Sequence, residues 1–103
     1  MKISKSQTDD LLRVLQKPRS IITILCLYHA KNEGLDMLLQ EIGGSKRTGM
    51  SRITELCKIG LVAKRIDEHG RKTFYTLSPV GKAIAEKLED IRAYWEENED
   101  RLS

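Results

Sequence analysis

The sequence predicts a single α+β domain that is mostly helical, and three observations support this fold class. The chain has 103 residues, which suits one domain with one core. Apolar residues recur at helical spacing through most of the chain, and the period changes to two only between residues 62 and 77. Proline and glycine divide the helical pattern into separate helices. We therefore expect one domain over residues 1–103, and the length excludes a two-domain enzyme.

The first two expected helices lie on either side of Pro18. The run Ser6-Gln-Thr-Asp9 is similar to a capping box and precedes several leucines, so it predicts a helix over about residues 7–16. Pro18 suits the start of a second helix, because a residue there needs no backbone N–H. Apolar residues continue at helical spacing, and Gly34 predicts an end at about residue 32.

Two further helices are expected on either side of Gly43-Gly44. A short helix over residues 35–42 has leucine and isoleucine along one side. The two glycines permit a sharp change of direction, and Ser45 can cap the next helix, which we place at residues 45–59. This fourth helix has one apolar face and one polar, mostly basic face.

A hairpin and a long helix complete the expected domain. The runs 62–66 and 72–77 are rich in β-forming residues, and Gly70 in the loop between them can adopt the positive φ that such a hairpin needs. The pair Ser78-Pro79 places a capping residue before a proline, which predicts a final helix over about residues 79–100. Residues 18–78 then hold the helical core and the hairpin.

This order of elements, together with two motifs, is typical of a winged helix-turn-helix. The run Leu56-Cys-Lys-Ile-Gly60-Leu61-Val62 resembles the L-x-x-x-G-L-V sequence that closes a recognition helix and enters the wing. The run Phe74-Tyr75-Thr-Leu77-Ser78-Pro79-Val-Gly81-Lys82 is similar to Y-x-L-T-x-x-G-[KR], which leaves the wing, with Ser in place of Thr. Over about residues 20–90 the chain thus resembles transcriptional regulators of the MarR, ArsR and PadR kind, including small archaeal ones.

Positive charge is concentrated in the middle of the chain. Residues 45–72 hold eight Lys and Arg against three acids, whereas residues 83–103 hold three basic against seven acidic residues, within a net charge of +3. A basic middle and an acidic tail suit a protein that holds a polyanion with one surface and keeps another surface off it.

The resemblance implies that the helix over residues 45–59 enters the DNA major groove. It implies too that the wing over residues 62–77 reaches the minor groove or the flanking backbone. Arg47 and Arg52 suit a bidentate contact to guanine, and the lysines suit phosphates. The expected DNA-binding residues are Ser45, Lys46, Arg47, Thr48, Ser51, Arg52, Lys58, Arg65, His69, Arg71 and Lys72.

Glu55 departs from this basic pattern, because it lies on the same face of the expected recognition helix. A carboxylate repels phosphate unless it pairs with Arg52 or accepts a hydrogen bond from cytosine N4. Glu55 therefore argues against very tight nonspecific binding. For each of the cations, the alternative is an ordinary solvated surface residue.

The final helix carries a second pattern, in which apolar residues recur at alternating spacings of four and three, as in a coiled-coil seam. Asn98 within this seam is more natural in a dimer, where a buried polar pair can fix the register. In the regulators that the chain resembles, terminal helices commonly form the dimer interface, which implies a homodimer. The alternative is one helix packed on its own domain. The expected interface residues are Leu11, Leu12, Leu15, Ile84, Leu88, Ile91, Trp95, Asn98 and Leu102.

An enzyme is not expected, because neither His29 nor His69 has an evident nucleophile or carboxylate partner. The run Gly43-Gly44-Ser45-Lys46 lacks the spacing of a phosphate-binding loop. A metal sensor is a weak alternative, since Cys26 and His29 supply only two ligands. Cys26 and Cys57 are expected to be buried thiols, with a bridge between them as the alternative. We expect no metal and no cofactor.

The sequence thus predicts a cytoplasmic, sequence-specific regulator that binds double-stranded DNA, with repression as the expected role. No apolar run is long enough to span a membrane, and the first residues do not form a secretory signal. One alternative is an architectural DNA-binding protein with little sequence preference. Another is a winged-helix module for protein–protein contact, although basic residues on both the recognition face and the wing argue against it.

Overall fold

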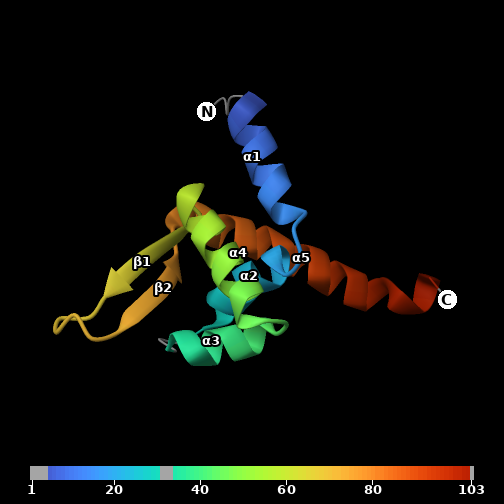
Figure 1. The fold of residues 1–103 in the computed structure, drawn as a ribbon. Coiled ribbons are helices and arrows are strands. Elements are labelled where there is room, and N and C mark those ends of the chain that lie inside the picture. The colour runs from blue at the N-terminus through green and yellow to red at the C-terminus, as the bar shows by residue number, and fades with distance from the viewer. Residues whose placement is uncertain (1–4, 31–33, 103) are drawn as a thin grey trace.

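The computed structural model describes residues 5–30 and 34–102. Within this part of the chain the elements are α1 (Lys5–Leu15), α2 (Ser20–His29), α3 (Leu35–Ile42), α4 (Lys46–Lys58), β1 (Val62–Ile66), β2 (Thr73–Leu77) and α5 (Pro79–Leu102). The mostly helical α+β class and the expected order of elements are confirmed. In Figure 1, α2, α3 and α4 cluster at the centre, while the hairpin, α1 and the far half of α5 extend from it in three directions.

The start and end of α2 differ from the prediction. Arg19 precedes the helix in a left-handed conformation, with φ of 67°, so the helix begins at Ser20. Pro18 therefore lies in the turn before α2 rather than within its first turn. The helix ends at His29, because Ala30 is extended; the predicted end was too late, and residue 32 itself lies outside the described residues. Gly34 instead precedes α3 as its N-cap.

The start of α1 also differs, since the helix begins at Lys5. Ser6 consequently lies inside the helix and not at the capping position before it. The bounds of α3 and β1 match the prediction, and β2 begins one residue later than expected.

The core lies where α2, α3 and α4 meet. Ile24, Ile42, Ile53 and Leu56 are fully buried there, each removed from water at a gain of about 1.5–3 kcal/mol. Leu61 and Val62 extend this cluster to the base of the hairpin, and Ala85 adds the first half of α5.

The hairpin forms one antiparallel sheet, in which Val62 pairs with Leu77 at the base and Ile66 pairs with Thr73 near the tip. Val62 is buried, whereas the following four residues of β1 are exposed. The base of the wing is therefore part of the core, β2 is half-buried throughout, and the tip extends away from the helices (Figure 1).

The junction between wing and α5 is tightly built around Gly81. A Cβ at this position would clash with the carbonyl oxygen of Leu61. The same oxygen accepts a hydrogen bond from the backbone N–H of Ser78 at 2.9 Å. The Ser78 hydroxyl donates to the carbonyl oxygen of Gly60 at 2.6 Å and accepts from the Gly81 N–H at 3.0 Å. Ser78 and Gly81 of the second motif thus fix how the last helix leaves the wing.

The two halves of α5 differ in their surroundings. Ile84 and Leu88 pack partly against the core, whereas Ile91 and Trp95 are 66% and 58% exposed. Figure 1 shows the second half extending past the other helices. None of the helices described is long and apolar enough to cross a membrane.

Candidate nucleic-acid interface

The side of α4 that faces away from the core carries a polar stripe. Arg47, Ser51, Thr54 and Lys58 follow one another at spacings of four, three and four, so they share one side of the helix. Arg47, Thr54 and Lys58 are exposed, and Ser51 is half-buried. We call these four residues the outward stripe. Thr54 was not among the expected DNA-binding residues, although the helical period alone places it on this side.

The first turn of α4 is capped as expected. The Ser45 hydroxyl oxygen accepts a hydrogen bond from the Thr48 backbone N–H at 3.1 Å, and the hydroxyl donates to Thr48 Oγ1 at 2.9 Å. Lys46 and Arg47 follow in exposed positions. A helix N-terminus carries partial positive charge from its free N–H groups and dipole, and two cations here add to the positive potential at this end.

The packing of α4 against α3 depends on Gly49. A Cβ at this position would lie 2.7 Å from Leu39 Cδ2, and Gly49 itself is buried. The two helices therefore approach closely at one point, which fixes the direction of the outward stripe relative to α3.

Glu55 is paired with two cations rather than free on the surface. Its Oε1 lies 2.8 Å from Arg52 Nη2, and its Oε2 accepts from Lys17 Nζ at 2.6 Å. The Arg52 pairing is one of the two arrangements that the sequence allowed, and Lys17 was not foreseen.

Arg52 consequently lies apart from the outward stripe. Its side chain is only 12% exposed, and its Nε is buried without a hydrogen-bond partner among the described residues. The expected contact between Arg52 and guanine does not fit this arrangement, because Glu55 holds the guanidinium against the side of the helix.

The expected DNA-binding residues of the wing lie in two places. His69, Arg71 and Lys72 are exposed at the tip, where the Asp67 carboxylate accepts hydrogen bonds from the backbone N–H groups of Arg71 at 2.7 Å and His69 at 3.2 Å. These bonds, that from Arg71 above all, lower the pKa of Asp67 below its usual value. The carboxylate thus orders the tip, and Gly70 completes the turn with φ of 68°.

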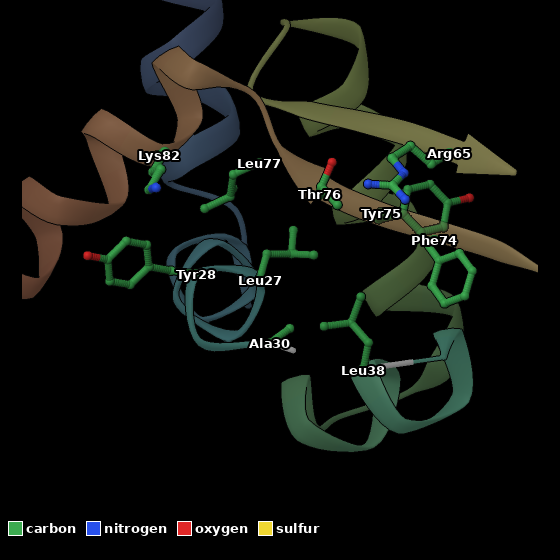
Figure 2. Close-up of a pocket in the computed structure, with 10 residues that line it drawn as sticks. All are labelled: Leu27, Tyr28, Ala30, Leu38, Arg65, Phe74, Tyr75, Thr76, Leu77 and Lys82. Carbon is green, nitrogen blue, oxygen red and sulfur yellow. The ribbon is translucent and has the colours of Figure 1, made fainter. Parts of the chain in front are cut away.

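Arg65 occupies a different position, beside a cavity of about 200 Å³ beneath the wing. Figure 2 shows Arg65 and Lys82 at opposite ends of this space, with Leu27 and Leu38 below them in the view. The remaining lining residues are Tyr28, Ala30, Phe74, Tyr75, Thr76 and Leu77. Arg65 is therefore associated with the underside of the wing and not with its tip.

A second candidate surface is apolar and follows the far half of α5. Ile91, Tyr94 and Trp95 are 66%, 71% and 58% exposed, and Leu12 on α1 is 48% exposed. Tyr94 was not among the expected residues. Asn98 uses its side-chain N–H to bond the Tyr94 carbonyl oxygen at 2.7 Å within its own helix.

The other expected interface residues divide into two groups. Leu11, Leu15, Ile84 and Leu88 are partly buried and pack against the core of the same chain. The side chain of Leu102 lies outside the described residues. The predicted seam thus runs from the domain core onto an exposed helix.

His29 has a carboxylate partner, contrary to the prediction. Its Nε2 lies 2.7 Å from Glu89 Oε1, a contact that spans from α2 to α5 and that spacing along the chain could not reveal. Cys26 and Cys57 are half-buried against the core and are not joined by a disulfide; burial raises the pKa of the Cys57 thiol. The described residues contain no group of three or more side chains arranged to hold a metal ion.

Solved structures of similar fold are known. No protein-family model matches this sequence, and no curated protein matches it. Among solved structures, the chain is similar to a possible HxlR family transcriptional factor from Thermoplasma volcanium, with 22% identity over 97% of this chain and 89% of the other, and a TM-score of 0.77.

Two further structures show the same similarity. The transcriptional repressor BigR from Xylella fastidiosa has 22% identity, with 88% of each chain covered and a TM-score of 0.71. MepR from S. aureus, solved in complex with DNA, has 18% identity over 94% of this chain and 82% of the other, with a TM-score of 0.67. The first of the three is described as a possible transcriptional factor and BigR as a transcriptional repressor. The chain therefore has the winged-helix fold that these regulators share.

Proposed function

We propose that this protein is a sequence-specific transcriptional regulator that binds double-stranded DNA as a homodimer, with repression as its expected effect. The outward stripe of α4 is the observation that carries the proposal. It places two exposed cations, Arg47 and Lys58, and two hydroxyl groups on one side of a capped helix. When such a helix lies in the major groove, this side can contact both base edges and backbone phosphates. A regulator of this kind acts on the chromosome, so we expect it in the cytoplasm.

The residues of α4 divide between bases and backbone. Arg47, near the start of the helix, is the candidate for a bidentate contact to O6 and N7 of guanine. The hydroxyl groups of Ser51 and Thr54 can contact base edges, and the Thr54 methyl group can contact thymine. Lys46 and Lys58 suit phosphates at either end of the helix, which orient the protein without reading sequence.

The wing adds a second contact. Three exposed groups at its tip, His69, Arg71 and Lys72, suit the minor groove or the adjacent phosphates. The Asp67 carboxylate is already bonded to two backbone N–H groups at the tip, so it orders the turn that carries these groups.

The exposed surface of α5 supports the homodimer. An apolar strip formed by Ile91, Tyr94 and Trp95 would be costly to leave in water, and a second copy of the same helix is its simplest partner. Two-fold symmetry would then set two recognition helices about 34–36 Å apart, on half-sites one helical turn from each other. We therefore expect an inverted-repeat operator.

Selection from a random-duplex library tests the proposal, followed by salt titration of the selected duplex and a scrambled control. A convergent inverted repeat that binds about a thousandfold more tightly than the control is the expected result. Failure to converge, combined with steep salt dependence, would indicate an architectural protein instead. Failure to bind any duplex would favour the remaining hypothesis, a winged-helix module for protein–protein contact.

A further inference from the structure

We infer that Glu55 makes DNA binding by α4 more selective, because it withholds the cations of Arg52 and Lys17 from DNA phosphates. This inference rests on the proposed function and assigns a part of it to a residue that touches no base. Glu55 is the one acidic residue of α4, a helix that holds four cations over residues 46–58. Its position there calls for an explanation, since a carboxylate beside DNA is repelled by phosphate.

Both oxygens of the Glu55 carboxylate are occupied. Oε1 faces Arg52 Nη2 at 2.8 Å and Oε2 faces Lys17 Nζ at 2.6 Å, so each oxygen neutralises a different cation. A carboxylate held in this way presents little unpaired charge to an approaching phosphate. Both cations are thus engaged by Glu55, Arg52 at 12% exposure and Lys17 at 39%.

Partial burial strengthens the ion pair between Arg52 and Glu55. The side chains of Arg52 and Glu55 are 12% and 22% exposed, whereas in the pair between Arg13 and Asp10 they are 68% and 53% exposed. Salt screens charges within a partly buried pair much less than it screens exposed charges. The pair between Arg52 and Glu55 should therefore persist at salt concentrations that abolish exposed pairs, whereas the pair with Lys17, whose side chain is 39% exposed, should be more sensitive to salt.

The consequence concerns the balance between specific and nonspecific binding. Each cation that neutralises a phosphate adds about 0.9 to the slope of log K against log salt, whatever the sequence of the DNA. Freeing Arg52 and Lys17 would thus strengthen binding to all duplexes and add no base contact. By holding them, Glu55 leaves Arg47 and the hydroxyl groups of the outward stripe with a larger share of the binding free energy.

The ion pair between Lys17 and Glu55 connects α4 to a second part of the chain, because Lys17 lies in the turn between α1 and α2. The contact from Lys17 to Glu55 spans 38 positions in the sequence and joins that turn to the recognition helix. An ion pair that only stabilises the contact between this turn and α4 would have the same geometry. The test must therefore separate an effect on stability from an effect on DNA selectivity.

The experiment compares wild-type protein with Glu55→Gln on the selected duplex and on its scrambled control, across a salt series. Glutamine keeps the shape and removes the charge. We expect Glu55→Gln to bind the scrambled duplex about threefold or more tightly, and its salt slope to steepen by about 0.9 for each cation released. The ratio of specific to nonspecific affinity should fall. Glu96→Gln is the matched control, because Glu96 also pairs with an arginine, Arg92, but lies on α5; it should change neither the slope nor the ratio.

A second variant keeps the test valid if Glu55→Gln unfolds. Arg52→Gln removes a cation from α4, yet it should leave the salt slope unchanged, because Arg52 contacts no phosphate in the wild-type protein. Where Glu55→Gln is folded, the double variant Arg52→Gln/Glu55→Gln should show a gain in slope that is smaller by about 0.9 than the gain of Glu55→Gln alone. Thermal unfolding curves establish that each variant is folded.

The possible failures are distinguishable. If the wild-type protein binds neither duplex, the proposed function fails and this inference fails with it. If the wild type is selective and Glu55→Gln has the same slope and ratio, only the inference is overturned. A parallel loss of affinity for both duplexes would make Glu55 a brace, and a shallower slope for Arg52→Gln would show that Arg52 already contacts phosphate. Either result contradicts the inference.

Discussion

The imidazole of His29 and the carboxylate of Glu89 join α2 to α5, with Nε2 and Oε1 2.7 Å apart. Glu89 also accepts from Arg92, whose guanidinium lies 2.9 Å from Oε2. The hydrogen bond to His29, followed by that to Arg92, lowers the pKa of Glu89. The hydrogen bond to Glu89, with a further contribution from Glu96, raises the pKa of Arg92. This cluster lies where α5 leaves the core, between Leu88 and Ile91.

Glu89→Gln should therefore destabilise the protein in a pH-dependent way. Because the pKa of Glu89 is lower in the folded state than in the unfolded state, its ionised form stabilises the fold above its ordinary pKa, and this contribution is lost as pH falls through the folded value. We expect wild type to unfold at a higher temperature than Glu89→Gln at pH 7, with the difference disappearing in acid. Thermal melts from pH 7 to pH 3 measure it. A difference that stays constant down to the lowest pH would contradict this assignment.

Gly81→Ala should be strongly destabilising. The added methyl group would clash with the carbonyl oxygen of Leu61, a backbone atom that cannot rotate away. Crowding of this kind costs about 1–3 kcal/mol, and here the wing or α5 must shift to relieve it. Gly34→Ala is the control at an uncrowded position, because no atom of the described residues beyond its own chain neighbours and helix backbone lies within 4 Å of an added Cβ, and its φ of −67° suits alanine. Urea denaturation compares the two, and equal midpoints would refute the proposed packing at the wing junction.

Ser45 should contribute separately to stability and to DNA binding. Ser45→Ala removes the cap on the Thr48 N–H and should lower the free energy of unfolding by about 0.5–2 kcal/mol. Ser45→Asp should retain the cap and the stability, but it places a negative charge where phosphate is expected. Chemical denaturation and DNA titration of both variants separate the two effects. Undiminished DNA binding by Ser45→Asp would remove the start of α4 from the interface.

The homodimer should depend on the far half of α5. Replacing both Ile91 and Trp95 by glutamate places charges on the exposed apolar strip, so the variant should sediment as a monomer while keeping its helical content. The matched control replaces Glu97 and Glu99, which lie on the same half of the helix, by glutamine. Sedimentation equilibrium of the wild type comes first: a wild-type monomer at all concentrations would contradict the dimer directly.

The elements that the sequence predicted best are those with strong local signals. Gly43-Gly44 and the Ser45 cap bound α3 and α4, and Ser78-Pro79 starts α5, because capping and backbone freedom act within a few residues. The start of α2 was predicted less well, since Arg19 adopts a left-handed conformation that no local pattern requires.

The candidate site could be predicted only in part, for a physical reason. The outward stripe follows from helical period, and Thr54 was recoverable in the same way. The partners of Glu55 were not fully recoverable, because Lys17 reaches it from a distant turn and only packing brings the two together. The sequence also could not show that α5 has a first half packed on the core and an exposed second half. Its apolar residues recur at the same spacing in both halves, so the pattern does not mark where the core ends.

In the proposed regulator α4 reads DNA sequence through Arg47, and a binding comparison of three proteins on two duplexes tests this claim. Wild type, Arg47→Ala and Lys72→Ala are titrated with the selected inverted repeat and with a scrambled duplex at several salt concentrations. We expect Arg47→Ala to cost about 1–3 kcal/mol on the selected duplex and much less on the scrambled one. Lys72→Ala should weaken both equally and reduce the salt slope by about one. Equal losses on both duplexes for Arg47→Ala would contradict the claim.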